Sequence, residues 1–209
     1  MTARFLEITA TPSVRAARQE NGSFGLWEPR GVDDRPDRLP DRAVAFIARR
    51  DSFYLATTSQ SGWPHVQHRG GPPGFLRVLD DRTLGFADFS GNRQYLSLGN
   101  LAADARAALI LVDYPNRARL KLLVHMKAYD LQAGPELAAR LVPAGYAAVP
   151  ERGFVLDLEA YDWNCPQHIT PRFTLAEIET ALAPLRARIA ALEAENQMLR
   201  AKAAEEREE

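Results

Sequence analysis

The chain has 209 residues, 46% of them hydrophobic and 25% charged, and a formal net charge of −1, which argues against a nucleic-acid-binding protein that relies on bulk attraction to phosphates. Cys165 is the only cysteine, so an intramolecular disulfide is excluded and secretion is not indicated. The first residues show no apolar segment typical of a secretory leader, and no run approaches the ~20 apolar residues that span a bilayer, so we expect a soluble cytoplasmic protein that does not enter a membrane.

Residues 1–38 are rich in Gly, Pro, Arg and Asp, which predicts an extended arm rather than a domain. The aromatic side chains of Phe24 and Trp27 would anchor this arm, and a disordered segment is the alternative. Residues 39–50 carry apolar side chains at helical spacing. This spacing predicts a short amphipathic helix at the start of the main domain, which we place at residues 39–173.

Runs of strand-forming residues follow at short spacing and are separated by turn residues. The predicted strands cover residues 53–58, 63–69, 75–79, 83–87, 107–113, 118–129 and 153–161, and short helices are predicted over residues 93–103 and 136–142. Strands joined by hairpins predict an antiparallel sheet that curls or closes, with a few helices as caps. A doubly wound nucleotide-binding fold is not expected, because strands and helices do not alternate and no GxGxxG or Walker motif is present.

Residues 174–209 form a third segment, which opens with the capping-box residues Thr174 and Glu177. A seven-residue repeat follows, with Leu175, Leu182, Ile189 and Asn196 at position a, and Ile178, Leu185, Leu192 and Leu199 at position d. The pairs Arg188–Glu193 and Glu195–Arg200 have opposite charges at the spacing that joins two parallel helices. This pattern predicts a dimeric coiled coil, with a helix packed on its own domain as the alternative. Pro184 predicts a break near Ala183.

Two polar strings carry the candidate chemistry. His65, Gln67 and Arg69 fall on one face of a predicted strand, and the glycines that follow would let a flat ligand approach the backbone. The second string, residues 86–94, joins a strand to a predicted helix start, where Ser90, Asn92, Arg93 and free backbone amides could bind an anion. A polar solvent-facing strand and ordinary helix capping are the alternatives.

In this order, the two strings resemble the pyridoxamine 5′-phosphate oxidase-like family of FMN-binding split barrels. Residues 161–169, with the sequence YDWNCPQHI, strengthen the resemblance, which covers roughly residues 40–173. It implies a mainly β (α+β) fold, an antiparallel split β-barrel with short capping helices, to which the C-terminal coiled-coil helix is appended. It also implies a homodimer with FMN at the subunit interface.

The resemblance further implies which residues contact the cofactor. They are Gln67, His68, Arg69, Gly70, Asp88, Ser90, Asn92, Arg93, Gln94, Arg119, Lys121, Gln167 and His168. Arg119 and Lys121 would face the cofactor from the dimer interface. Cys165 and His168 could form a nucleophile–base pair, although a buried cysteine in a Pro-fixed turn is an equal alternative. No metal site is expected, and no catalytic residue is assigned.

The function expected from these features is that of an FMN-dependent oxidoreductase, which moves hydride or electrons between FMN and an unidentified small molecule. The alternative is a non-enzymatic flavin-binding or redox-sensing module with a coiled-coil dimerisation tail. A structural coiled-coil dimer with a ligand-free barrel, and a related cofactor such as haem or deazaflavin, remain open. The chain lacks the lysine of the oxidase strand and the closing Arg-Leu-His-type motif, so pyridoxamine 5′-phosphate is not the expected substrate.

Overall fold

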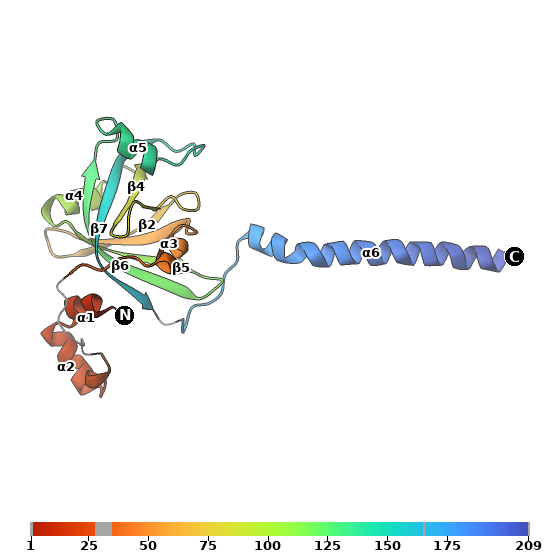
Figure 1. Ribbon diagram of the computed structural model, residues 1–209, viewed down its shortest axis with the longest axis horizontal. Helices are drawn as coiled ribbons and strands as arrows, with labels where there is room; N and C mark the ends of the chain where they lie inside the picture. Colours follow the sequence, from red (N-terminus) through yellow and green to blue (C-terminus); the bar gives the residue numbers. More distant parts are fainter. Residues whose placement is uncertain (1, 28–34, 165, 209) are drawn as a thin grey trace. The chain divides into compact units, whose positions relative to one another are not determined.

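The chain forms two units, residues 1–169 and residues 170–209. The computed structural model describes residues 2–27, 35–164 and 166–208 (Figure 1). Cys165, and with it the expected pairing with His168, lies outside the described residues. In the described part of the chain, no helix is long and apolar enough to cross a membrane.

A seven-stranded antiparallel sheet forms the body of the first unit, in the order β2-β1-β5-β6-β7-β4-β3. Its strands are β1 (Ser52–Thr58), β2 (Pro64–Gly70), β3 (Arg77–Val78), β4 (Thr83–Phe89), β5 (Arg106–Asp113), β6 (Ala118–Tyr129) and β7 (Pro150–Asn164). Every predicted strand is therefore present. β3 is shorter than expected, and β7 begins three residues earlier and ends three residues later than its predicted range.

The sheet curls because its two ends share one aromatic core. Phe53 of β1 stacks on Phe75 with 5.5 Å between ring centroids, and meets Phe86 of β4 edge-on at 5.2 Å. β1 and β4 are not neighbours in the sheet, so these contacts bring distant strands together. All three rings are at most 2% exposed. The fold is thus the predicted antiparallel split β-barrel.

Three short helices flank the barrel, namely α3 (Asp41–Ile47), α4 (Leu96–Ala103) and α5 (Pro135–Leu141). The helices predicted over residues 39–50 and 136–142 are confirmed. α4 begins three residues later than predicted, because Arg93 and Tyr95 have left-handed backbone angles, with φ of 59° and 52°. Residues 90–94 therefore form a loop rather than the start of a helix.

The N-terminal segment is helical, so the prediction of an extended arm was wrong. Helices α1 (Ala3–Thr9) and α2 (Pro12–Glu20) are each capped by a threonine side chain, which accepts a backbone N–H bond of the first turn. A short 3-10 helix, η1 (Phe24–Leu26), follows. The anchor is Phe5, which is 7% exposed, whereas Trp27 is 44% exposed. An ion pair between Arg4 and Glu159 adds to the docking of α1 on β7.

The second unit contains one helix, α6 (Leu175–Glu208). Its capping box is present, since the Glu177 amide donates to Thr174 Oγ1 at 3.2 Å and the Thr174 amide donates to Glu177 Oε2 at 2.8 Å. The helix continues through Pro184, so the expected break near Ala183 was wrong. A proline removes a single N–H bond of the ladder, and the turns on either side of it remain helical over 34 residues.

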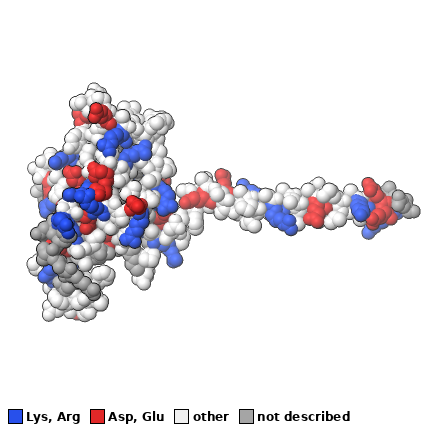
Figure 2. All heavy atoms as spheres, in the orientation of Figure 1, with Lys and Arg blue, Asp and Glu red and all other residues white. Residues whose placement is uncertain are grey.

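Acidic and basic side chains are interspersed on the face of the molecule seen in Figure 2. This mixture agrees with the formal net charge of −1. The face in view therefore has no broad patch of one charge of the kind that attracts a polyanion.

Candidate functional site

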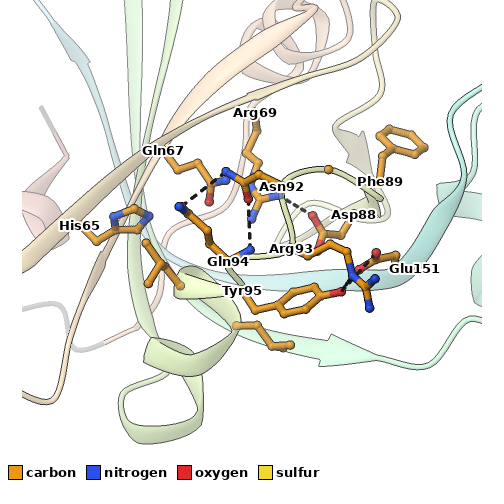
Figure 3. A pocket seen from close by; sticks show the side chains of 13 residues that line it. His65, Gln67, Arg69, Asp88, Phe89, Asn92, Arg93, Gln94, Tyr95 and Glu151 are labelled. Carbon is orange, nitrogen blue, oxygen red and sulfur yellow. Dashed lines mark hydrogen bonds and ion pairs between the residues drawn. The ribbon is translucent and has the colours of Figure 1, made fainter.

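A cavity of about 290 Å³ lies where β2, the end of β4, the loop before α4 and the start of β7 meet (Figure 3). We call it the Arg69 cavity. It is lined by His65, Gln67, Arg69, Asp88, Phe89, Gly91, Asn92, Arg93, Gln94, Tyr95, Leu96, Leu98 and Glu151. Its polar residues lie mainly on β2 and the loop, and Phe89, Leu96 and Leu98 give it an apolar wall.

Strand β2 supplies three of the lining side chains through its two-residue period. His65, Gln67 and Arg69 point to the cavity side and are half-buried, whereas Val66 and His68 between them are exposed. Gln67 is held in place by Ser97 of α4, whose hydroxyl donates to Gln67 Oε1 at 3.1 Å. The alternation of polar residues along this strand thus places three side chains together, as predicted.

Arg69 is oriented by a carboxylate on the other side of the cavity. Its guanidinium forms an ion pair with Asp88 of β4, and the two side chains are only 17% and 8% exposed. Burial raises the pKa of Asp88, and the charges of Arg69 and Arg152 oppose that rise. Arg69 Nε has no hydrogen-bond partner among the described residues although it is buried. The ion pair therefore fixes Arg69 and leaves a donor unused.

The loop before α4 presents polar groups from the opposite side. The Gln94 amide donates to Asn92 Oδ1 at 3.2 Å, which closes a tight turn around Arg93. Arg93 Nε donates to the Tyr95 hydroxyl at 3.3 Å. The left-handed backbone at Arg93 and Tyr95 produces this arrangement, in which the two side chains lie side by side at the cavity (Figure 3).

Six of the cavity residues were predicted from the sequence to contact a cofactor, and the fold brings them together. They are Gln67, Arg69, Asp88, Asn92, Arg93 and Gln94. Tyr95 and Glu151, for which no such contact was predicted, also line the cavity. Glu151 lies outside the predicted strand 153–161, and only the pairing of β4 with β7 brings it to the site. No local pattern in the sequence could have identified it.

Three other assigned residues near the cavity do not line it. His68 lies on the outer face of β2, where its ring meets that of Tyr54 edge-on at 5.6 Å. Gly70 ends β2 and Ser90 is exposed, with its amide bonded to the Val149 carbonyl at 2.8 Å. These positions leave their proposed contact with a cofactor untested.

The glycines after β2 were expected to let a flat ligand approach the backbone, but at Gly71 the structure places a core side chain instead. A β-carbon there would lie 2.7 Å from the ring of Phe75. The missing side chain therefore makes room for a core aromatic residue. Gly74 has a φ of +77°, and a β-carbon would lie 2.8 Å from the Ala48 carbonyl oxygen. Both glycines are needed for packing of the barrel.

The remaining assigned residues lie away from the cavity of a single chain. Arg119 and Lys121 are on β6, where Lys121 Nζ is 3.8 Å from Asp162 Oδ2 and 5.9 Å from the centroid of the Phe5 ring. Gln167 and His168 are exposed after β7. The fold of one chain does not unite these four with the Arg69 cavity.

The donor set of the cavity suits a phosphate monoester. Arg69 and Arg93 are cationic, Asn92 and Gln94 offer amide groups, and buried nitrogen atoms of His65 and Arg69 lack partners among the described residues. The cavity volume of about 290 Å³ is close to the lower limit of the ~300–1,000 Å³ of small-molecule sites. Among the described residues, no group of three or more His, Cys, Asp or Glu could hold a metal ion.

Comparison with known proteins adds a family match. The family model described as pyridoxamine 5′-phosphate oxidase matches residues 39–147, which include every lining residue of the Arg69 cavity except Glu151. A comparison with curated proteins gave no match.

Several solved structures show a distant likeness. A putative pyridoxamine 5′-phosphate oxidase from Lactobacillus delbrueckii is 20% identical with a TM-score of 0.47, covering 60% of this chain and 93% of that chain. HupZ of Group A Streptococcus is 13% identical with a TM-score of 0.46, covering 65% and 99%. An FMN-binding protein from Syntrophomonas wolfei is 16% identical with a TM-score of 0.44, covering 73% and 97%. Likenesses this distant carry no information about the ligand of this chain.

Proposed function

Because this chain belongs to the pyridoxamine 5′-phosphate oxidase family, we propose that it is a flavoprotein that binds FMN with the phosphate in the Arg69 cavity. The proposed activity is that of an oxidoreductase, which moves hydride or electrons between FMN and a small molecule. The observation that carries the proposal is the convergence of Arg69, from β2, with the 92–94 loop on one cavity. When bound, FMN supplies the redox chemistry.

The residues of the chain bind and orient the phosphate end. Arg69 is held by Asp88 before any ligand arrives, so little side-chain entropy is lost when it receives an anion. Arg93 adds a second cation, and the amide groups of Asn92 and Gln94 add neutral donors. Two cations and several amides match a phosphate dianion.

A second copy of the chain is proposed to complete the site. Arg119, Lys121, Gln167 and His168, which the family resemblance assigns to FMN, lie outside the cavity of one chain. Large apolar side chains are exposed on the β1–β2 hairpin, including Trp63 in the turn before β2 at 76% and Val66 of β2 at 62%. A homodimer with FMN at its interface would cover them.

Titration with two flavins tests the proposal. We expect the protein to bind FMN with a dissociation constant in the micromolar range or below, and binding to quench the fluorescence of the flavin. Riboflavin, which lacks the phosphate, should bind at least about tenfold more weakly. Equal affinity for both flavins would place the phosphate outside the cavity. Failure to bind either flavin would rule out the cofactor.

A separate experiment tests the oxidoreductase activity. The bound flavin is bleached by an added reductant and is then reoxidised with candidate acceptors.

A second candidate function is a non-enzymatic flavin-binding or redox-sensing module whose C-terminal helix joins two copies. The observation that favours it is the apolar seam of α6, where Leu175 is 79% exposed, Leu185 60% and Leu199 60%. An apolar seam stabilises a helix only when a partner covers it. The opposite charges of Arg188 and Glu193 suit a parallel second copy.

Replacing Leu192 by aspartate is expected to abolish pairing of α6, because a charge would enter a d position of the seam. The helical circular-dichroism signal should then fall, since an isolated helix is marginal in water. Met198→Asp, which places the same charge at a c position outside the seam, is the matched control and should keep the signal. Equal signals in both variants and in the unaltered protein would show that α6 does not pair through this seam.

A further inference from the structure

Glu151 enters the Arg69 cavity because β7 contains a bulge. Asp88 of β4 pairs with Arg152, but the next residue, Phe89, pairs with Pro150. Glu151 is therefore the extra residue on β7. Bulges of this kind occur next to functional sites and change the direction in which a side chain points.

The bulge brings two adjacent side chains to the same side of the strand. In a regular strand, neighbouring side chains point to opposite faces, yet Arg152 Nη2 donates to Glu151 Oε2 at 2.6 Å. Arg152 also lies 4.8 Å from the centroid of the Tyr95 ring, and its Nε is 3.8 Å from Asp88 Oδ2. Arg152 thus connects Glu151, Tyr95 and Asp88, although it does not itself line the cavity.

The carboxylate of Glu151 is linked to the cation of the loop. The Tyr95 hydroxyl donates to Glu151 Oε1 at 3.4 Å, and Arg93 Nε donates to the same hydroxyl at 3.3 Å. Glu151 therefore lies two hydrogen bonds from Arg93, as Figure 3 shows. Its side chain is 20% exposed, so water screens its charge only in part.

The charges around the cavity nearly cancel. Asp88 opposes Arg69 and Glu151 opposes Arg152 through ion pairs, whereas Arg93 is linked to the Glu151 carboxylate through the Tyr95 hydroxyl. An anion that binds beside Arg93 approaches a negative charge on Glu151. Tyr95 also has a contact besides Glu151, because the guanidinium of Arg152, which faces Asp88 as well, lies over its ring.

We propose that Glu151 is a specificity-determining residue of the Arg69 cavity, whose carboxylate competes with the phosphate of a bound ligand for the Arg93–Tyr95 pair. The inference rests on the proposed function for the identity of the ligand, but its charge argument applies to any phosphate. Glu151 lowers the affinity for the phosphate group and leaves the rest of a flavin unaffected. The preference for FMN over riboflavin is therefore smaller than the cations alone would give.

The experiment compares four proteins by calorimetric titration with FMN, riboflavin and inorganic phosphate. They are the unaltered protein, Glu151→Gln, Glu151→Asp and Asp157→Asn. Glu151→Gln removes the charge at nearly constant shape, and Glu151→Asp keeps it. Asp157→Asn removes the same charge from an exposed position on β7 and serves as the matched control. Thermal unfolding of each variant confirms that it is folded before titration.

Glu151→Gln is expected to bind FMN about tenfold more tightly than the unaltered protein, whereas its affinity for riboflavin changes by less than about twofold. Glu151→Asp and Asp157→Asn should both stay close to the unaltered protein. Unchanged or weaker FMN binding by Glu151→Gln would overturn the inference, as would an equal gain for riboflavin. If no protein binds flavin, the proposed function fails and the phosphate titration decides: tighter phosphate binding by Glu151→Gln supports the inference, and equal, weaker or absent binding overturns it.

Discussion

Arg69→Ala is expected to weaken FMN binding about 100-fold and to leave riboflavin binding much less affected. A charge-assisted hydrogen bond contributes ~1.5–3 kcal/mol, and ~2.7 kcal/mol corresponds to 100-fold. Arg69 is the most buried cation that lines the cavity, with 17% of its side chain exposed, so water cannot replace it easily. Fluorescence titration with both flavins measures the change.

The same substitution should also destabilise the barrel. Asp88 is 6% exposed, and without Arg69 its nearest cation is Arg152, whose Nε lies 3.8 Å away. Breaking a buried ion pair from one side costs about 3–5 kcal/mol, and we expect the lower end because Arg152 remains. The double variant Arg69→Ala/Asp88→Asn should regain much of the stability, because no charge is then left unpaired, but it should not regain FMN binding.

The loss of stability in Arg69→Ala should depend on pH. Burial already raises the pKa of Asp88 above its ordinary value of 3.8, and the loss of Arg69 removes the largest opposing charge. The folded state then takes up a proton more readily than the unfolded state. The deficit should be smallest below pH 3.8 and should grow as the pH rises through the folded-state pKa.

Denaturant unfolding at several pH values measures this dependence, with Arg77→Ala as the control. Arg77 is an exposed arginine on β3, and its removal should change neither flavin binding nor the pH profile. A deficit in Arg69→Ala that is the same at low and neutral pH would show that the Arg69–Asp88 pair does not act through charge. FMN affinity within threefold of the unaltered protein would contradict the role of Arg69.

Phe53→Ala is expected to lower the free energy of unfolding by about 3–5 kcal/mol, the usual cost of deleting a buried aromatic side chain. Phe53 is 1% exposed and contacts both Phe75 and Phe86. These contacts join β1 to β4, which the sheet itself does not pair. FMN binding should weaken as well, because Phe53 pairs with Arg69 across β1 and β2, and Phe86 lies two residues before Asp88.

Thermal unfolding compares Phe53→Ala with Phe53→Leu. Leucine refills most of the volume, so it should cost less than half as much and should keep FMN affinity closer to that of the unaltered protein. Comparison of the two variants therefore separates the effect of lost core volume from the effect of lost aromatic contacts between β1 and β4. A stability loss below about 1 kcal/mol in Phe53→Ala would show that the aromatic cluster does not hold the ends of the sheet together.

The fold and half of the candidate site follow from local patterns. Alternation along one strand brings His65, Gln67 and Arg69 to one side, and a continuous loop brings Asn92, Arg93 and Gln94 to the other. The residues of each pattern lie within a few positions of one another in the sequence, so each pattern can be recognised there. Hairpins at short spacing likewise predict an antiparallel sheet, because each strand pairs mostly with its neighbour along the chain.

The remaining features depend on contacts that no local pattern records. Glu151 reaches the cavity only through a bulge in the pairing of β4 with β7. The N-terminal segment is polar enough to suggest an arm, but two threonine caps and the burial of Phe5 make it helical and docked. Pro184 suggests a break in α6, yet one missing hydrogen bond does not end so long a helix. At Glu151 and Phe5 a long-range contact outweighs the local preference, and at Pro184 the length of the helix does.

The structure of the protein crystallised with FMN tests the central claim most directly. The phosphate should lie within hydrogen-bond distance of Arg69 and of the 92–94 loop, inside the Arg69 cavity. A second cavity of about 380 Å³ lies on the first unit between Ile8 and His125. Phosphate bound there, or FMN bound with its phosphate in solvent, would contradict the assignment of the Arg69 cavity as the phosphate site.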